Sequence, residues 1–111
     1  LNAACVRWRK PMVEAAMNGM EAYLTTIIPG ETPCLSCLFP EKPEWDRRAF
    51  GVLGAVSGTL ATLTALEAIK VITGLGKPLL SQLLTMDLGT LEFAKRRPYH
   101  DPHCPVCGNP T

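Results

Sequence analysis

The sequence predicts an α/β fold: a mixed β-sheet that includes a β-hairpin, a central buried helix and a zinc knot made by four cysteines. The first observation behind this prediction is a pair of Cys-x-x-Cys motifs, at residues 34–37 and 104–107. The second is the stretch 59–73, which repeats apolar residues at helical spacing. The third is a set of short apolar runs bounded by turn residues, which is typical of strands. With 111 residues, these parts fit a single domain, residues 1–111.

Four cysteines form the candidate metal site: Cys34 and Cys37 in one motif, Cys104 and Cys107 in the other. Two thiolates separated by two residues can bind one metal ion from a single turn of backbone. Two such turns complete a tetrahedral site with Zn–S bonds of about 2.3 Å. A single Cys-x-x-Cys could also be a redox disulfide, but two of them in loop-like surroundings favour zinc. Four protein thiolates leave no open position for water or substrate, so we expect a structural site.

Three further residues offer alternatives at or near this site. His100 and His103 precede the second motif and could each replace one sulfur as a ligand, although four cysteines are available. Cys5 is the odd cysteine. We expect it to be a small apolar residue on a buried face, with a reactive thiol as the alternative.

Composition limits the class of protein. The chain is 47% hydrophobic and 19% charged, which is enough apolar material for a core. A formal net charge of +1 gives no reason to expect nucleic acid or an anionic membrane as a partner. The weakly polar run 51–72 contains Glu67 and Lys70, so we do not expect it to span a membrane. Five cysteines, four at metal spacing, fit a reducing cytosol, and we expect a cytoplasmic protein without a signal peptide.

The first part of the chain predicts a helix followed by two strands. Residues 1–10 have the pattern of the later turns of a helix that Pro11 ends, so we expect a fragment of a longer protein. The apolar run 11–17 follows directly, and this order predicts a strand of a mainly parallel sheet. An Asn-Gly turn signal comes next, and residues 20–28 predict a second strand that ends in β-branched residues.

Residues 39–50 predict an exposed loop, because two prolines and six charged residues occur in this short span. Trp45 could anchor a partner there or fold back on its own domain. Arg47 and Arg48 could bind a phosphate or a carboxylate, or form a solvated charge cluster. We keep these three as candidate partner-binding residues.

The next segment predicts the central helix. Residues 51–58 contain three glycines among small and apolar residues, a composition that permits close backbone approach. Residues 59–73 then predict a helix that Gly74 stops. Its wide apolar face indicates a largely buried position, where Glu67 and Lys70 can pair.

The last segment predicts a β-hairpin. Residues 79–88 and 90–95 are apolar or alternating runs, with residues 87–90 as the turn. Residues 98–103 lead into the second cysteine motif. The chain has no Gly-x-Gly-x-x-Gly, no phosphate loop and no recognisable Ser/His/Asp set. The residues taken alone therefore indicate a zinc knot on an α/β core and no catalytic constellation.

The order of motifs nonetheless resembles one family. The segments that carry the resemblance are Leu1-Asn2-Ala3-Ala4-Cys5, Pro33-Cys34-Leu35-Ser36-Cys37, Gly51-Val52-Leu53-Gly54-Ala55-Val56-Ser57-Gly58, Ala65-Leu66-Glu67-Ala68-Ile69-Lys70, Thr73-Gly74 and Cys104-Pro105-Val106-Cys107-Gly108. Together they resemble the C-terminal half of the ThiF/MoeB/HesA family, bacterial relatives of ubiquitin-activating enzymes. The resemblance covers essentially the whole chain.

The resemblance implies an activity for the complete protein. Such a protein binds ATP and Mg2+ in a Rossmann-like N-terminal half and forms a homodimer. It adenylates the C-terminal Gly-Gly carboxylate of a ubiquitin-fold sulfur-carrier protein, which then receives sulfur for thiamin or molybdopterin synthesis. The glycine-rich loop and the nucleotide-contacting residues would precede Leu1. This chain would supply carrier docking and structural zinc.

The resemblance also gives a role to residues 39–50, which would form the crossover loop over the carrier's extended tail. Some relatives have a cysteine in this loop that links covalently to the carrier. The matching position here is Arg47, which favours a member that only adenylates. The alternative function is a zinc-stabilised protein-interaction module without catalysis. A redox protein that uses its Cys-x-x-Cys pairs is a more distant third.

Overall fold

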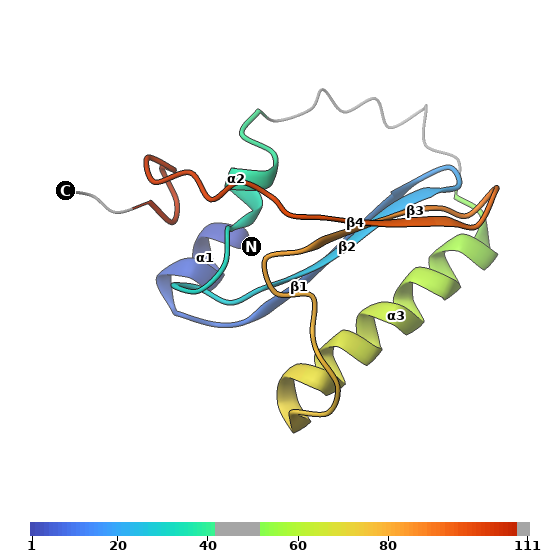
Figure 1. The fold of residues 1–111 in the computed structure, drawn as a ribbon, viewed down its shortest axis with the longest axis horizontal. Helices are drawn as coiled ribbons and strands as arrows, with labels where there is room; N and C mark the ends of the chain where they lie inside the picture. The colour runs from blue at the N-terminus through green and yellow to red at the C-terminus, as the bar shows by residue number, and fades with distance from the viewer. Residues whose placement is uncertain (42–51, 109–111) are drawn as a thin grey trace.

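The computed structural model describes residues 1–41 and 52–108. Three helices and four strands lie within them. In chain order they are α1 (Asn2–Arg7), β1 (Met12–Asn18), β2 (Glu21–Ile27), α2 (Leu35–Leu38), α3 (Gly54–Thr73), β3 (Leu83–Asp87) and β4 (Glu92–Arg96). The four strands form one sheet, and α3 crosses one face of it (Figure 1).

The strands lie in the order β1-β2-β3-β4, and every neighbouring pair is antiparallel. A tight turn joins β1 to β2, with Gly19 at φ 62°, a left-handed conformation that glycine adopts without steric cost. The predicted hairpin is present as β3 and β4, although both strands are shorter than the predicted runs.

The prediction of a mainly parallel sheet around residues 11–17 is wrong for the strands described here. Both hairpins force their strands to run antiparallel, because parallel strands need a long crossover connection. Even β2 and β3, which are separated by α3 in sequence, pair antiparallel. The parallel component of the described sheet is a single isolated bridge between Thr26 and Leu80.

Two hydrophobic clusters make up the core of the described residues. The first lies between the sheet and α3 and consists of Ala22, Leu24, Leu60, Leu79 and Met86. The second lies beneath the two Cys-x-x-Cys motifs and consists of Met12, Ile27, Cys34 and Cys104. The first cluster therefore holds α3 against the sheet, and the second holds the cysteine motifs against Met12 and Ile27.

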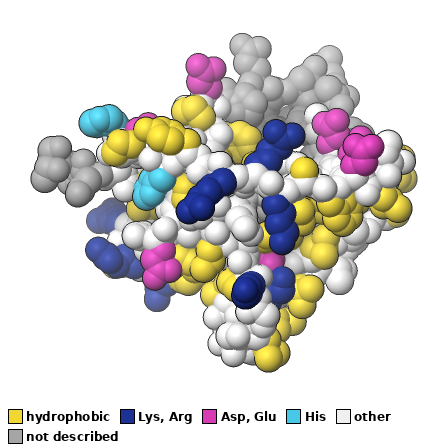
Figure 2. Space-filling model, in the orientation of Figure 1, with side chains coloured by type: hydrophobic (Ala, Val, Ile, Leu, Met, Phe, Trp, Pro, Cys, Tyr) yellow, Lys and Arg dark blue, Asp and Glu magenta, His cyan; other side chains and the backbone are white. Residues whose placement is uncertain are grey.

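Helix α3 begins earlier than predicted and is less buried than predicted. It starts at Gly54, so part of the glycine-rich segment is helical, and a Cβ added at Gly54 or Gly58 would meet no atom within 4 Å. Among the described residues, these glycines therefore make no close backbone contact. Leu66, Ile69 and Ile72 keep 47%, 49% and 82% of their surface exposed. Figure 2 shows apolar side chains at the lower right, where α3 runs.

By length and composition, α3 is the one helix in the described part of the chain that could cross a membrane. A core helix meets the same criterion, and Leu60 of α3 packs into the first cluster. The hydroxyls of its threonines donate to carbonyls of the preceding turn. These pairs are Thr59 to Ala55, Thr62 to Gly58, Thr64 to Leu60 and Thr73 to Ile69.

Glu67 fastens α3 to the sheet and to the segment before β3. Its Oε2 accepts hydrogen bonds from the Thr26 hydroxyl at 2.7 Å and from the Leu79 N–H at 2.8 Å. Its Oε1 lies 2.9 Å from Lys70 Nζ, which is the pairing predicted from their spacing. Glu67 is 2% exposed, and burial alone would raise its pKa. The Leu79 N–H, the Thr26 hydroxyl and Lys70 outweigh burial and lower the pKa, so the carboxylate stays ionised.

We expect Glu67→Gln to lower the free energy of unfolding by about 1–2 kcal/mol at pH 7, because charge-assisted hydrogen bonds become neutral ones. Since the pKa of Glu67 is lowered in the folded state, its contribution is complete above the unfolded pKa and is lost as the pH falls through the folded value. Urea titrations at pH 7 and in acid should show the gap between parent and variant closing in acid. Glu92→Gln, on exposed β4, is the matched control. A gap that does not depend on pH would contradict the assignment.

Candidate metal centre

Two turns of backbone present the four cysteines. In the first, the carbonyl of Cys34 accepts hydrogen bonds from the N–H groups of Cys37 at 3.1 Å and Leu38 at 3.2 Å, so α2 begins at the motif. In the second, the carbonyl of Cys104 accepts from the N–H of Gly108 at 2.9 Å. A Cβ on Gly108 would lie 2.5 Å from the Cys104 carbonyl oxygen, so only glycine permits this turn.

The structure brings all four sulfur atoms together. Cys34 Sγ lies 3.7 Å from Cys104 Sγ, and Cys37 Sγ lies 3.3 Å from Cys107 Sγ. The four Sγ atoms lie within 4.8 Å of one another. A tetrahedron with Zn–S bonds of about 2.3 Å has edges of about 3.8 Å, so one four-coordinate ion fits these residues. All five cysteines are free thiols, and the short contacts join one motif to the other.

The thiols differ in how readily they ionise. Burial raises the pKa of Cys37 and that of Cys107. Burial also acts to raise the pKa of Cys104, but N–H donors from Cys107 and Val106 outweigh it and lower the pKa to about 7. Sulfurs this close cannot all carry charge unaided, and a divalent cation would supply the compensating charge. The donor set therefore suits a metal that prefers thiolates.

The histidines are placed differently from the cysteines. His100 Nε2 lies 3.6 Å from Cys107 Sγ, within reach of a hydrogen bond to the sulfur. The backbone N–H of His103 donates to Asp101 Oδ1 at 2.8 Å, and its side chain is exposed. Within residues 1–41 and 52–108, the candidate metal group contains the four cysteines and neither histidine.

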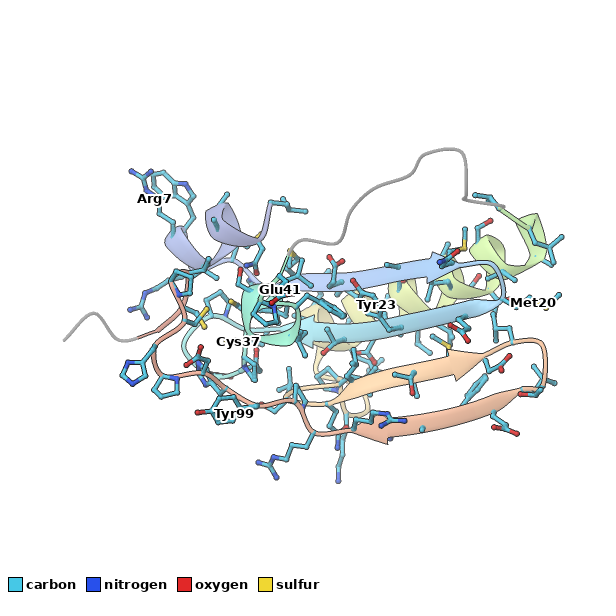
Figure 3. All side chains as sticks on the ribbon, turned by 90° about the horizontal axis from the view of Figure 1, so that it is seen from above. Arg7, Met20, Tyr23, Cys37, Glu41 and Tyr99 are labelled. Atoms are coloured by element: carbon cyan, nitrogen blue, oxygen red, sulfur yellow. The ribbon has the colours of Figure 1, made fainter. Side chains whose placement is uncertain are left out.

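Cys5 lies outside the metal group and packs, half-buried, against the second hydrophobic cluster, as its predicted apolar role requires. Figure 3 shows the sulfur atoms gathered near Cys37, between α2 and the C-terminal loop.

The candidate partner-binding residues Trp45, Arg47 and Arg48 lie outside the described residues, so their role stays a prediction. Most of the predicted loop, residues 39–50, also lies outside the described residues.

One contact residue was missed by sequence reasoning. Asn2 of α1 contacts the first cysteine turn through both atoms of its amide. Asn2 stands next to an unremarkable Ala-Ala pair, and no spacing rule links it to a motif so far along the chain. Only its place in the Leu1–Cys5 segment drew attention to it.

Comparison with known proteins gives a consistent result. Residues 1–106 match the model of the ThiF family. The chain is 83% identical over 109 residues to the heterocyst HesA protein of Trichormus variabilis, covering 98% of this chain and 41% of that protein. It is 41% identical over 112 residues to the adenylyltransferase and sulfurtransferase MOCS3 of Drosophila ananassae, covering 96% of this chain and 25% of that protein.

Solved structures agree on the fold. A crystal structure of E. coli MccB matches 97% of this chain and 36% of the MccB chain, with a TM-score of 0.78 at 24% identity. This likeness concerns the fold alone. The chain spans about two fifths of the length of the HesA protein and a quarter of MOCS3.

We expect Cys34→Ser or Cys107→Ser to abolish stoichiometric metal binding and to lower the melting temperature markedly, because an incomplete site forfeits much of the metal's contribution to folding. Metal content by mass spectrometry and thermal unfolding with and without a chelator would measure this. Cys5→Ser is the matched control and should keep its metal. If a metal-site variant melted like the parent, the cysteines would not hold a structural ion.

Proposed function

The chain belongs to the ThiF family, and from this premise we propose that it forms part of an ATP-dependent activating enzyme. The enzyme would adenylate the C-terminal Gly-Gly of a ubiquitin-like sulfur-carrier protein, in sulfur transfer of the thiamin or molybdopterin type. The observation that carries the proposal is the 41% identity to a protein named adenylyltransferase and sulfurtransferase. The chain spans a minority of that protein, so the activity is assigned to a longer parent.

The proposed reaction needs ATP and Mg2+, which we place in the nucleotide-binding half that the resemblance puts before Leu1. There, a carboxylate oxygen of the carrier would attack the α-phosphate of ATP and displace pyrophosphate. The product is an acyl-adenylate, in which AMP is a good leaving group for a later sulfur nucleophile. Positioned cations would stabilise the charge that develops on the phosphates. We assign no catalytic residue to this chain.

We assign Zn2+ to the four cysteines, as a structural ion. Four thiolate ligands close its coordination sphere, so it would bind no substrate. When bound, it would fasten α2 to the C-terminal loop, two segments that are 70 positions apart in the sequence. The thiolate donor set and the 3.7 Å and 3.3 Å sulfur contacts support this assignment. Free thiols also suit a reducing compartment, and we propose a cytoplasmic location.

We place carrier docking on the sheet face opposite α3, next to the β3–β4 hairpin. Leu24 packs in the cluster against α3, so its neighbour Tyr23 points to the other face. There the Tyr23 ring lies 5.1 Å from that of Phe39, and Figure 3 shows Tyr23 on β2. Burial, assisted by the Glu14 carboxylate, raises the pKa of Tyr23 to about 12, so its hydroxyl stays a donor, bonded to Glu14. Strand β4 is exposed along its whole length.

The exposed side of α3 supports the larger parent. Leu66, Ile69 and Ile72 are large apolar side chains exposed on this helix, and a patch of such residues commonly marks a surface that another element or subunit covers. We propose that the nucleotide-binding half, or the second subunit of a homodimer, covers this surface. Nucleic acid and membranes are not part of the proposal, since the net charge is only +1.

We expect the full-length parent to catalyse ATP–pyrophosphate exchange only when a carrier ending in Gly-Gly is present. Exchange of radiolabelled pyrophosphate into ATP, with intact carrier and with carrier lacking the last two glycines, would measure this. The truncated carrier should give background exchange. No exchange from a folded, zinc-loaded protein with any candidate carrier would favour the alternative, a zinc-stabilised interaction module.

We expect addition of the carrier to shift the backbone amide resonances of β3 and β4 and to leave those of α1 nearly unchanged. Heteronuclear NMR titration of the labelled protein would measure both sets at once. Tyr23→Ala should weaken binding, because it removes the aromatic pair from the proposed face. Undisturbed hairpin amides in the presence of bound carrier would place docking elsewhere.

A further inference from the structure

Asn2, the first residue of α1, holds the first cysteine turn at three points. Its Oδ1 accepts a hydrogen bond from the backbone N–H of Leu35 at 3.1 Å. Its Nδ2 lies 3.2 Å from Ser36 Oγ and 3.6 Å from Cys34 Sγ. A single amide therefore contacts three consecutive residues of a turn that is far away in sequence.

The hydrogen-bond pattern fixes the orientation of this amide. The N–H of Leu35 lies in the first turn of α2, where it has no partner within the helix and can only donate. The acceptor facing it must be the amide oxygen, because the amide nitrogen has no acceptor capacity. The NH2 group consequently faces Cys34 Sγ and Ser36 Oγ.

We propose that Asn2 is a positioning residue for the metal centre: its N–H stabilises the Cys34 thiolate, and its oxygen fixes the turn that presents this thiolate. The inference rests on the zinc site proposed above. Zn2+ with four thiolates carries a formal charge of about −2, so the sulfurs favour N–H donors. Cys34 is 1% exposed and has little access to water. A donor from the protein must take the place of water.

The test compares substitutions that separate the two contacts. Zinc affinity is measured in the full-length protein by competition with a chromophoric chelator. Asn2→Ala removes both the N–H donor to Cys34 and the acceptor for Leu35. It should weaken zinc binding by about 10–100-fold, as is usual when a residue that hydrogen-bonds a metal ligand is removed. Asn2→Asp keeps an acceptor for Leu35 but replaces the N–H donor with negative charge beside the sulfur. We expect it to bind zinc at least as weakly as Asn2→Ala.

Asn18→Ala, at the exposed end of β1, is the matched control and should leave zinc affinity unchanged. Asn2→Asp with normal zinc affinity would reduce Asn2 to a helix cap and overturn the proposal, since aspartate caps helices as well as asparagine does. Normal affinity in Asn2→Ala would overturn it as well. An unmodified protein that takes up no zinc would instead refute the zinc site itself, and the inference with it.

Discussion

The meeting of two distant cysteine turns is the constraint on which this end of the molecule depends. Cys34 and Cys104 are 70 positions apart in the sequence, yet both are buried and belong to the same hydrophobic cluster. That cluster also includes Met12 and Ile27, at the ends of the paired strands β1 and β2. Bringing the four cysteines together thus fixes the C-terminal loop against the sheet. A short α2 with four residues could not do this by packing alone.

A different interaction holds α3 against the sheet. The Glu67 carboxylate joins α3, β2 and the segment at Leu79 through three charge-assisted contacts in a site that is almost closed to water. A buried carboxylate is favourable only if hydrogen-bond donors or a cation replace the water that it has lost. The fold is therefore fastened by two interactions of contrasting chemistry, a group of sulfur atoms and a buried carboxylate.

The sequence was informative wherever a local rule determines the structure. The cysteine spacing predicted which side chains meet, and Gly74 ends α3 as predicted, in a left-handed conformation at φ 76°. The family resemblance, carried by motifs over the whole chain, is confirmed by the match over residues 1–106. Local sequence rules failed where tertiary contacts determine the structure. Glycine at position 54 did not prevent helix, and the run 11–17 gave no sign of its antiparallel partner. Asn2 reaches its cysteine only through the fold.

The threonines of α3 have a consequence for whatever surface comes to cover this helix. Each hydroxyl that donates to a carbonyl of its own helix has already exchanged water for an internal partner. Removing water from this surface therefore leaves few polar groups unsatisfied, and a covering partner needs no matching donors or acceptors. Recognition at α3 would then be governed by shape and contact area. Such an interface tolerates threonine-to-valine substitutions but not an added charge. Substitutions on this surface of α3 can therefore exchange uncharged side chains of similar shape and still keep the interface.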